Sequence, residues 1–114
     1  MTYTIHTPSA TRLKNEIIDR VSAGADANGV SIDTWKCVET EDGDKVLTYN
    51  VDGWVEKGCI ALKQNQTHNQ IKVIYCSWED GKERENDDDK IMLSRFTELI
   101  LVHFRYFIDK LTIE

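Results

Sequence analysis

Carboxylates are the most abundant side chains in this sequence that could bind a partner or a metal ion, and they are concentrated in two segments. The sequence has 20 aspartates and glutamates against 14 lysines and arginines, a formal net charge of −6. Residues 39–56 carry a charge of −5, residues 79–89 carry another −5, and the rest of the chain is +4. Because carboxylates repel phosphates and attract basic groups, this pattern argues against direct nucleic-acid binding and favours a basic protein surface as partner.

An antiparallel meander would bring Asp52 and Glu56 to the same end of a sheet as residues 79–89. Asp26 is expected at that end too, and the acidic turn at residues 41–44 is expected at the opposite end. The same charges would also be found on solvated loops that only keep a protein soluble. The candidate partner-binding residues are all acidic: Asp52, Glu56, Glu79, Asp80, Glu83, Glu85, Asp87, Asp88 and Asp89.

No spacing in the sequence supports a metal site or a catalytic centre. The turn at residues 42–44 does not continue as a calcium-binding loop, because Val46 and Leu47 stand where a ligand and a glycine are needed. No nucleophile elbow and no phosphate-binding glycine motif is present. We therefore expect no catalytic residues, no metal and no cofactor, and we expect that the protein is not an enzyme.

Three cysteines and three histidines remain as possible reactive groups or zinc ligands. Cys37, Cys59 and Cys76 are far apart and never form a C-x-x-C pair, so we interpret them as reduced, mostly buried strand residues. His103 lies on the apolar side of a predicted helix, which is typical of a core or interface histidine with a hydrogen-bond partner.

The elements that position these side chains follow from the hydrophobic periodicity. A period near 3.6 predicts an amphipathic helix that begins after Pro8 and runs to about Ala23. Alternating positions then predict four strands, with short turns that favour an antiparallel meander. These strands are residues 32–40, 45–51, 55–64 and 70–78. Residues 3–5 are a further candidate, for a short edge strand.

A long C-terminal helix is predicted over residues 87–113. Asn86 is a good N-cap, and Asp87, Asp88 and Asp89 place negative charge at the positive end of the helix, with Asp89 set to form a capping-box-like pair. The predicted core joins apolar residues of both helices: Leu13, Ile17, Val21, Phe96, Ile100, Phe104 and Phe107.

The fold expected from this order is a single α+β domain spanning residues 1–114. It has two layers, with the first helix, the four-stranded meander and the long last helix in sequence and both helices on one sheet face. No secretory signal is visible at the start of the chain, and the longest apolar window, residues 99–107, is too short to cross a membrane. We therefore expect a cytoplasmic protein that does not bind membranes.

In its size, acidity and lack of catalytic motifs, the chain resembles the small phage-encoded inhibitors of bacterial defence, anti-CRISPR proteins among them, and the immunity proteins that neutralise nucleases. This resemblance implies an inhibitor that acts as a nucleic-acid mimic and whose acidic end occupies a basic nucleic-acid channel of its target. The alternative is a homodimeric structural or regulatory protein that associates through apolar surface of its last helix. The identity of the target and the choice between monomer and homodimer stay open.

Overall fold

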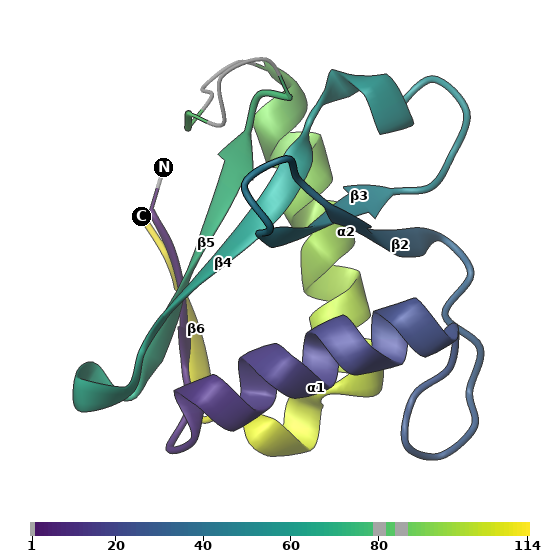
Figure 1. The fold of residues 1–114 in the computed structure, drawn as a ribbon. Helices are drawn as coiled ribbons and strands as arrows, with labels where there is room; N and C mark the ends of the chain where they lie inside the picture. The colour runs from purple at the N-terminus through teal and green to yellow at the C-terminus, as the bar shows by residue number, and fades with distance from the viewer. Residues whose placement is uncertain (1, 79–81, 84–86) are drawn as a thin grey trace.

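The computed structural model describes residues 2–78, 82–83 and 87–114. In these residues a six-stranded antiparallel sheet packs with two α-helices, so the fold is α+β (Figure 1). The strands lie in the order β2-β3-β4-β5-β1-β6. The elements are β1 Tyr3–His6, α1 Ala10–Ala23, β2 Trp35–Glu39, β3 Lys45–Tyr49, β4 Cys59–Asn65, β5 Gln70–Cys76, α2 Asp87–His103 and β6 Lys110–Ile113, with short 3₁₀ turns η1 Val55–Lys57, η2 Gln66–His68 and η3 Arg105–Phe107.

Helix α1 forms where the sequence predicts it. Leu13, Ile17 and Val21 recur at helical spacing and are all buried, so one face of the helix is held against the sheet. The helix ends at Gly24, which adopts the left-handed conformation and donates its N–H to the carbonyls of Arg20 and Val21.

The prediction of a helix over residues 87–113 is wrong beyond His103. The chain leaves the helix at Phe104, makes one 3₁₀ turn, and becomes the strand β6, which pairs with β1 along its whole length. Thr2 and Glu114 extend this pairing by exchanging two backbone hydrogen bonds of 2.8 Å. Without β6, strand β1 would present an edge of unpaired backbone N–H and C=O groups. Pairing of residues 110–113 with β1 therefore gives hydrogen bonds to both segments, whereas another helical turn would leave the β1 edge unpaired.

Two further corrections concern the sheet. It has six strands in the described chain and not four, because both terminal segments join the meander formed by β2, β3, β4 and β5. Strand β1 is also not an edge strand, since it lies between β5 and β6.

Tyr3 connects the inner strand β1 to helix α2. Its hydroxyl lies 2.6 Å from Oγ1 of Thr97, and the Thr97 hydroxyl in turn donates to the carbonyl of Leu93 at 2.8 Å. Since Thr97 has only one hydroxyl hydrogen, Tyr3 is the donor of the first bond. Burial raises the pKa of Tyr3, which keeps its phenol protonated.

One buried cluster unites α1, α2 and one set of alternating sheet positions. Six of the seven predicted core residues are buried, and Phe107 is the exception, because it lies half-buried beyond the end of α2. The sheet residues in this cluster are Tyr3, Ile5, Trp35, Leu47, Ile60, Leu62, Ile71, Val73 and Tyr75.

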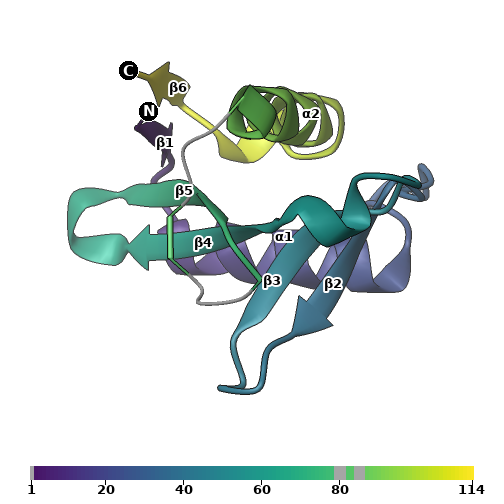
Figure 2. The ribbon, with the colours of Figure 1, turned by 90° about the horizontal axis from the view of Figure 1, so that it is seen from above.

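The opposite sheet positions carry a smaller apolar cluster. Val46, Cys59, Ala61 and Cys76 are buried there, with Val38 and Ile74 packed beside them. Figure 2 shows the β2–β3 hairpin diverging from β4 and β5. In agreement, β3 and β4 share a single register pair between Leu47 and Ile60. The divergence leaves a hollow on this side of the sheet.

Candidate functional site

The structure describes five of the nine predicted partner-binding side chains. Asp52, Glu56 and Glu83 are exposed, Asp88 is half-buried and Asp89 is buried. Glu79, Asp80 and Glu85 lie outside the described residues, and Asp87 is the first residue of α2. Because Asp89 is buried, it differs from the exposed acids predicted to form the same surface, and it is left out of the surface proposed below.

Asp89 is unusual among these acids. Its Oδ1 atom is buried and has no hydrogen-bond partner among the described residues. The predicted pair with Asn86 involves a residue outside the described part of the chain.

The turn η1 is bonded to the end of strand β5. The indole Nε1 of Trp78 donates to the carbonyl of Val55 at 2.9 Å, and the Tyr75 hydroxyl donates to the carbonyl of Lys57 at 2.7 Å. The Lys57 ammonium also lies 3.6 Å from Oδ1 of Asp88. The connection that carries Glu56 is therefore bonded both to β5 and to the first turn of α2.

Glu83 is held near the same end by the backbone. It forms a bridge with Cys76, which pairs on its other side with Cys59 of β4. Two strand spacings, roughly 10 Å, therefore separate the backbone at Glu83 from that at Cys59, the second residue after Lys57. Lys82 contributes a further backbone bond, since its carbonyl accepts from the N–H of Ser77 at 3.0 Å.

The meander predicted that the acidic turn between β2 and β3 lies at the opposite end of the sheet from Glu56 and Glu83. The structure instead places this turn near the end of β5. Its side chains line a hollow of about 640 Å³ together with Ser77 and Trp78, which directly follow β5. The physical reason is the divergence of the β2–β3 hairpin, which turns away from β4 (Figure 2). Side chains of its turn and residues of β4 and β5 then line one hollow. The charged residues that line this sheet hollow are Lys14, Glu39, Glu41, Asp42, Asp44, Lys45 and Lys63.

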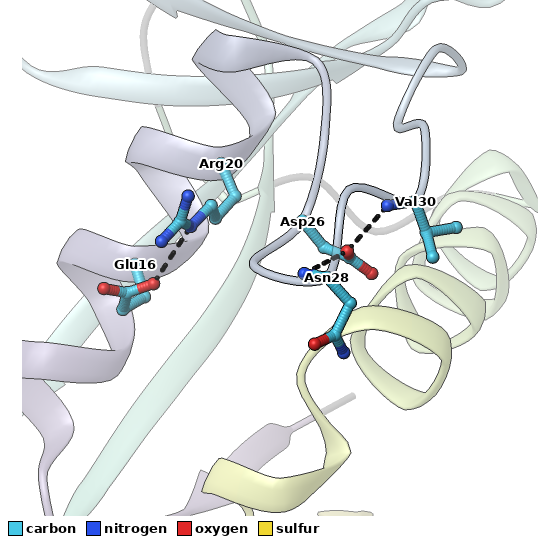
Figure 3. Close-up of polar contacts among 5 residues, drawn as sticks. All are labelled: Glu16, Arg20, Asp26, Asn28 and Val30. Carbon is cyan, nitrogen blue, oxygen red and sulfur yellow. Dashed lines mark hydrogen bonds and ion pairs between the residues drawn. The ribbon is translucent and has the colours of Figure 1, made fainter.

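Asp26 lies at the other end of α2, contrary to the sequence-based prediction. Its Oδ2 is 2.8 Å from Nδ1 of His103, the last residue of the helix. Its Oδ1 accepts backbone hydrogen bonds from Asn28 and Val30, each 2.9 Å long (Figure 3). The hydrogen bond to His103 is the main cause that lowers the pKa of Asp26, and the backbone bonds add to it while burial opposes it.

The interpretation of His103 as a histidine with a buried partner agrees with this geometry. Its side chain is 9% exposed and that of Asp26 is 5% exposed. His103 also contributes to a shallow hollow of about 200 Å³ between α2 and the segment before β2. The other residues that line it are Ser31, Ile32, Asp33, Thr34, Trp35, Tyr49, Arg95, Glu98, Leu99 and Val102.

Sequence reasoning missed the Asp26–His103 pair. The stretch of Asp26, Asn28 and Gly29 indicates a turn, because aspartate side chains accept backbone N–H groups two residues on. Nothing in that local pattern identifies His103 as the second partner.

The cysteines are free thiols, as the sequence suggested. Cys59 and Cys76 face each other across β4 and β5, and both are buried, while Cys37 is half-buried. Burial and, to a smaller extent, the neighbouring Cys76 raise the pKa of Cys59 to about 12. Because the thiolate is the reactive form, Cys59 is an inert thiol at neutral pH.

Across residues 2–78, 82–83 and 87–114, no group of three histidine, cysteine, aspartate or glutamate side chains is arranged to hold a metal ion. Neither helix in that part of the chain has the length and apolar character needed to span a membrane.

Comparison of this chain with protein-family models, with curated proteins and with solved structures found no match.

Proposed function

We propose that this chain is a small acidic protein-binding inhibitor. Its acidic end would occupy a basic nucleic-acid-binding surface on a target protein, in the way expected of an anti-CRISPR or nuclease-immunity protein. The surface we assign to this role contains the exposed carboxylates of Asp52, Glu56 and Glu83, with Glu79, Asp80, Glu85, Asp87 and Asp88 as sequence-based members.

The observation that carries the proposal is the set of bonds that anchors the acid-bearing segments. Trp78 bonds to the carbonyl of Val55 beside Glu56, and Glu83 forms a bridge with β5. Carboxylates held in place before binding lose less conformational entropy on association than carboxylates on a free loop. Their shared charge would also accelerate encounter with a basic surface.

The acidic hairpin tip supports an extension of this surface. Glu39, Glu41, Asp42 and Asp44 are exposed or line the sheet hollow that Trp78 also lines. Trp78 is 37% exposed, and a partly exposed tryptophan is a common anchor in protein interfaces. A basic partner would thus meet an aromatic side chain flanked by carboxylates.

The test is a charge-reversal comparison with a matched control. The triple variant D52K/E56K/E83K reverses three exposed acids of the proposed surface, and D19K/D109K/E114K reverses three exposed acids elsewhere. Each protein is immobilised and incubated with a bacterial lysate at low and at high salt, and bound proteins are eluted with a single-stranded oligonucleotide.

We expect the unmodified protein and the control triple variant to capture proteins at low salt, and we expect the oligonucleotide to release them. High salt should prevent this capture, because it screens the attraction between charges. The D52K/E56K/E83K variant should capture none of them, because like charges now face the partner. Equal capture by all three proteins at both salt concentrations would remove the acidic surface as the binding site.

A further inference from the structure

Four exposed residues of α2 form a straight stripe along its outer side. Ile91, Arg95, Glu98 and Val102 follow a spacing of four, three and four residues, which places them within about 60° of one another around the helix. Ile91 is 43% exposed and Val102 is 65% exposed, and the side chains of Arg95 and Glu98 are 48% and 64% exposed. Figure 2 shows α2 at the outside of the fold, and no helix or strand of the described residues lies beyond it. We call these four residues the α2 stripe.

The order of chemistry along the α2 stripe is self-complementary. From Ile91 to Val102 the stripe is apolar, basic, acidic and apolar. The outer pair, Ile91 and Val102, and the inner pair, Arg95 and Glu98, are both centred midway between positions 96 and 97. A second copy turned by a two-fold axis through this midpoint runs antiparallel to the first. It then places its Ile91 over Val102 and its Arg95 over Glu98, and the reverse contacts follow by symmetry.

We propose that the α2 stripe is a homodimer interface through which two copies of this chain pack their α2 helices antiparallel. The occupant is a second copy because the charges complement one another under the two-fold operation. In the single chain, Arg95 and Glu98 form an exposed ion pair of 3.0 Å, which contributes little to stability. In the dimer each of them gains a second partner of opposite charge between apolar contacts that exclude water.

The neighbouring surface leaves room for this packing. Arg95, Glu98 and Val102 also line the hollow of about 200 Å³ between α2 and residues 31–35. Leu101, beside the stripe, is 48% exposed and adds apolar area at the same end as Val102. Side chains of the second copy can therefore enter the hollow without displacing the core.

The interface is modest in size. Helix α2 has 17 residues and is roughly 25 Å long, so two such helices bury less surface than an obligate dimer. The expected association is reversible and weak. It uses none of the carboxylates assigned to the acidic end, and its test measures self-association and not the capture of a partner, so it stands or falls independently of the proposed function.

The experiment is sedimentation of the whole chain over roughly 10 µM to 1 mM, the range in which small interfaces associate. The average mass of the unmodified protein should rise from that of a monomer toward that of a dimer. R95E sets carboxylate against carboxylate in both symmetric pairs, and E98R sets guanidinium against guanidinium. Each should weaken dimerisation by about tenfold or more.

Two further samples separate direct pairing from other effects. An equimolar mixture of R95E and E98R should recover the dimer, because one copy presents two carboxylates and the other two guanidinium groups. The double variant R95E/E98R should recover it as well, because the exchanged charges are again complementary. K90E reverses an exposed charge on α2 outside the stripe and should dimerise like the unmodified protein.

Circular dichroism and the urea midpoint of each variant verify that the fold is intact. An unmodified protein that remains monomeric at 1 mM would overturn the proposal. It would also be overturned if the mixture of R95E and E98R stayed monomeric, or if K90E weakened association as much as R95E does.

Discussion

Asp26 and His103 are 77 residues apart in the sequence, and their side chains meet at 2.8 Å between Oδ2 and Nδ1. The same carboxylate accepts two backbone N–H groups of its own loop, so it joins residues 26–30 to the end of α2. Because the pair is almost fully buried, loss of either partner leaves a polar group without a hydrogen bond in a low-dielectric site.

The first prediction concerns the acid stability that this carboxylate contributes. The pKa of Asp26 is lowered from 3.8, so the folded state holds its proton less tightly than the unfolded state. The stabilisation is therefore present above about pH 4 and is lost as pH falls through the lowered pKa. D26N should have a lower urea midpoint than the unmodified protein at pH 7, and this difference should shrink below pH 4.

D26A should be less stable than D26N, since an asparagine still accepts the N–H groups of Asn28 and Val30. The control is D19N, at an exposed position on α1, which should change the midpoint little. If D26N and the unmodified protein had equal midpoints from pH 3 to pH 7, the buried pair would have no thermodynamic role.

The second prediction tests the last strand. Truncation after Asp109 removes β6 and its backbone pairing with β1. Each lost hydrogen bond costs on the order of 1 kcal/mol, so the free energy of unfolding should fall by several kcal/mol. The measurement is urea unfolding followed by circular dichroism. A fall of only a few tenths of a kcal/mol would instead fit residues 110–114 as a frayed helix end.

The third prediction concerns the close approach of Gly58, which precedes β4, to strand β5. A Cβ atom added there would lie 2.4 Å from Cε2 of Tyr75 and 2.7 Å from the carbonyl oxygen of Cys76. G58A should therefore lower the free energy of unfolding by roughly 1–3 kcal/mol through overpacking.

G29A is the comparison for this variant, because Gly29 has a φ of +80° and no atom within 4 Å of an added Cβ. It reports the backbone cost alone, which is roughly 1–2 kcal/mol for a side chain in the left-handed region. Equal losses for the two variants in the same urea titration would show that β5 can move away from Gly58.

The fourth prediction compares three phenylalanines. Phe96 and Phe104 are fully buried, so F96A and F104A should each cost roughly 3–5 kcal/mol. Phe107 is only partly buried, with the guanidinium of Arg12 5.9 Å from the centre of its ring, so F107A should cost clearly less. Urea midpoints of the three variants give the ranking, and an F107A loss as large as that of F104A would contradict the burial described above.

The fifth prediction concerns the thiols. With a pKa of about 12, Cys59 should not react with a thiol reagent in the folded protein at pH 8, whereas all three cysteines should react after unfolding in urea. A thiol count by absorbance before and after unfolding provides the measurement. Fast modification of Cys59 in the native protein would mean that β4 opens readily.

Local patterns in the sequence determined a large part of this fold. The spacing of Leu13, Ile17 and Val21 defines α1, and alternation with turn residues places β2, β3, β4 and β5 within a few residues of their observed bounds. These features depend on which side chains face one side of a helix or strand, and that is set by neighbours three or four positions away in a helix and two positions away in a strand. The two acidic segments are likewise visible without any structure.

Tertiary structure decided the rest, because it depends on which distant segments meet. Residues 104–113 fit the continuation of a helix, yet the chain turns at residues 105–107 and residues 110–113 pair with the open edge of β1 as a strand. The residues around Asp26 do not identify His103 as its partner. The turn residues of the β2–β3 hairpin do not predict its divergence from β4, which brings its acids to the hollow that Trp78 also lines. Backbone pairing and buried hydrogen bonds are satisfied by whichever group the folded chain places nearby, and sequence periodicity contains no information about that partner.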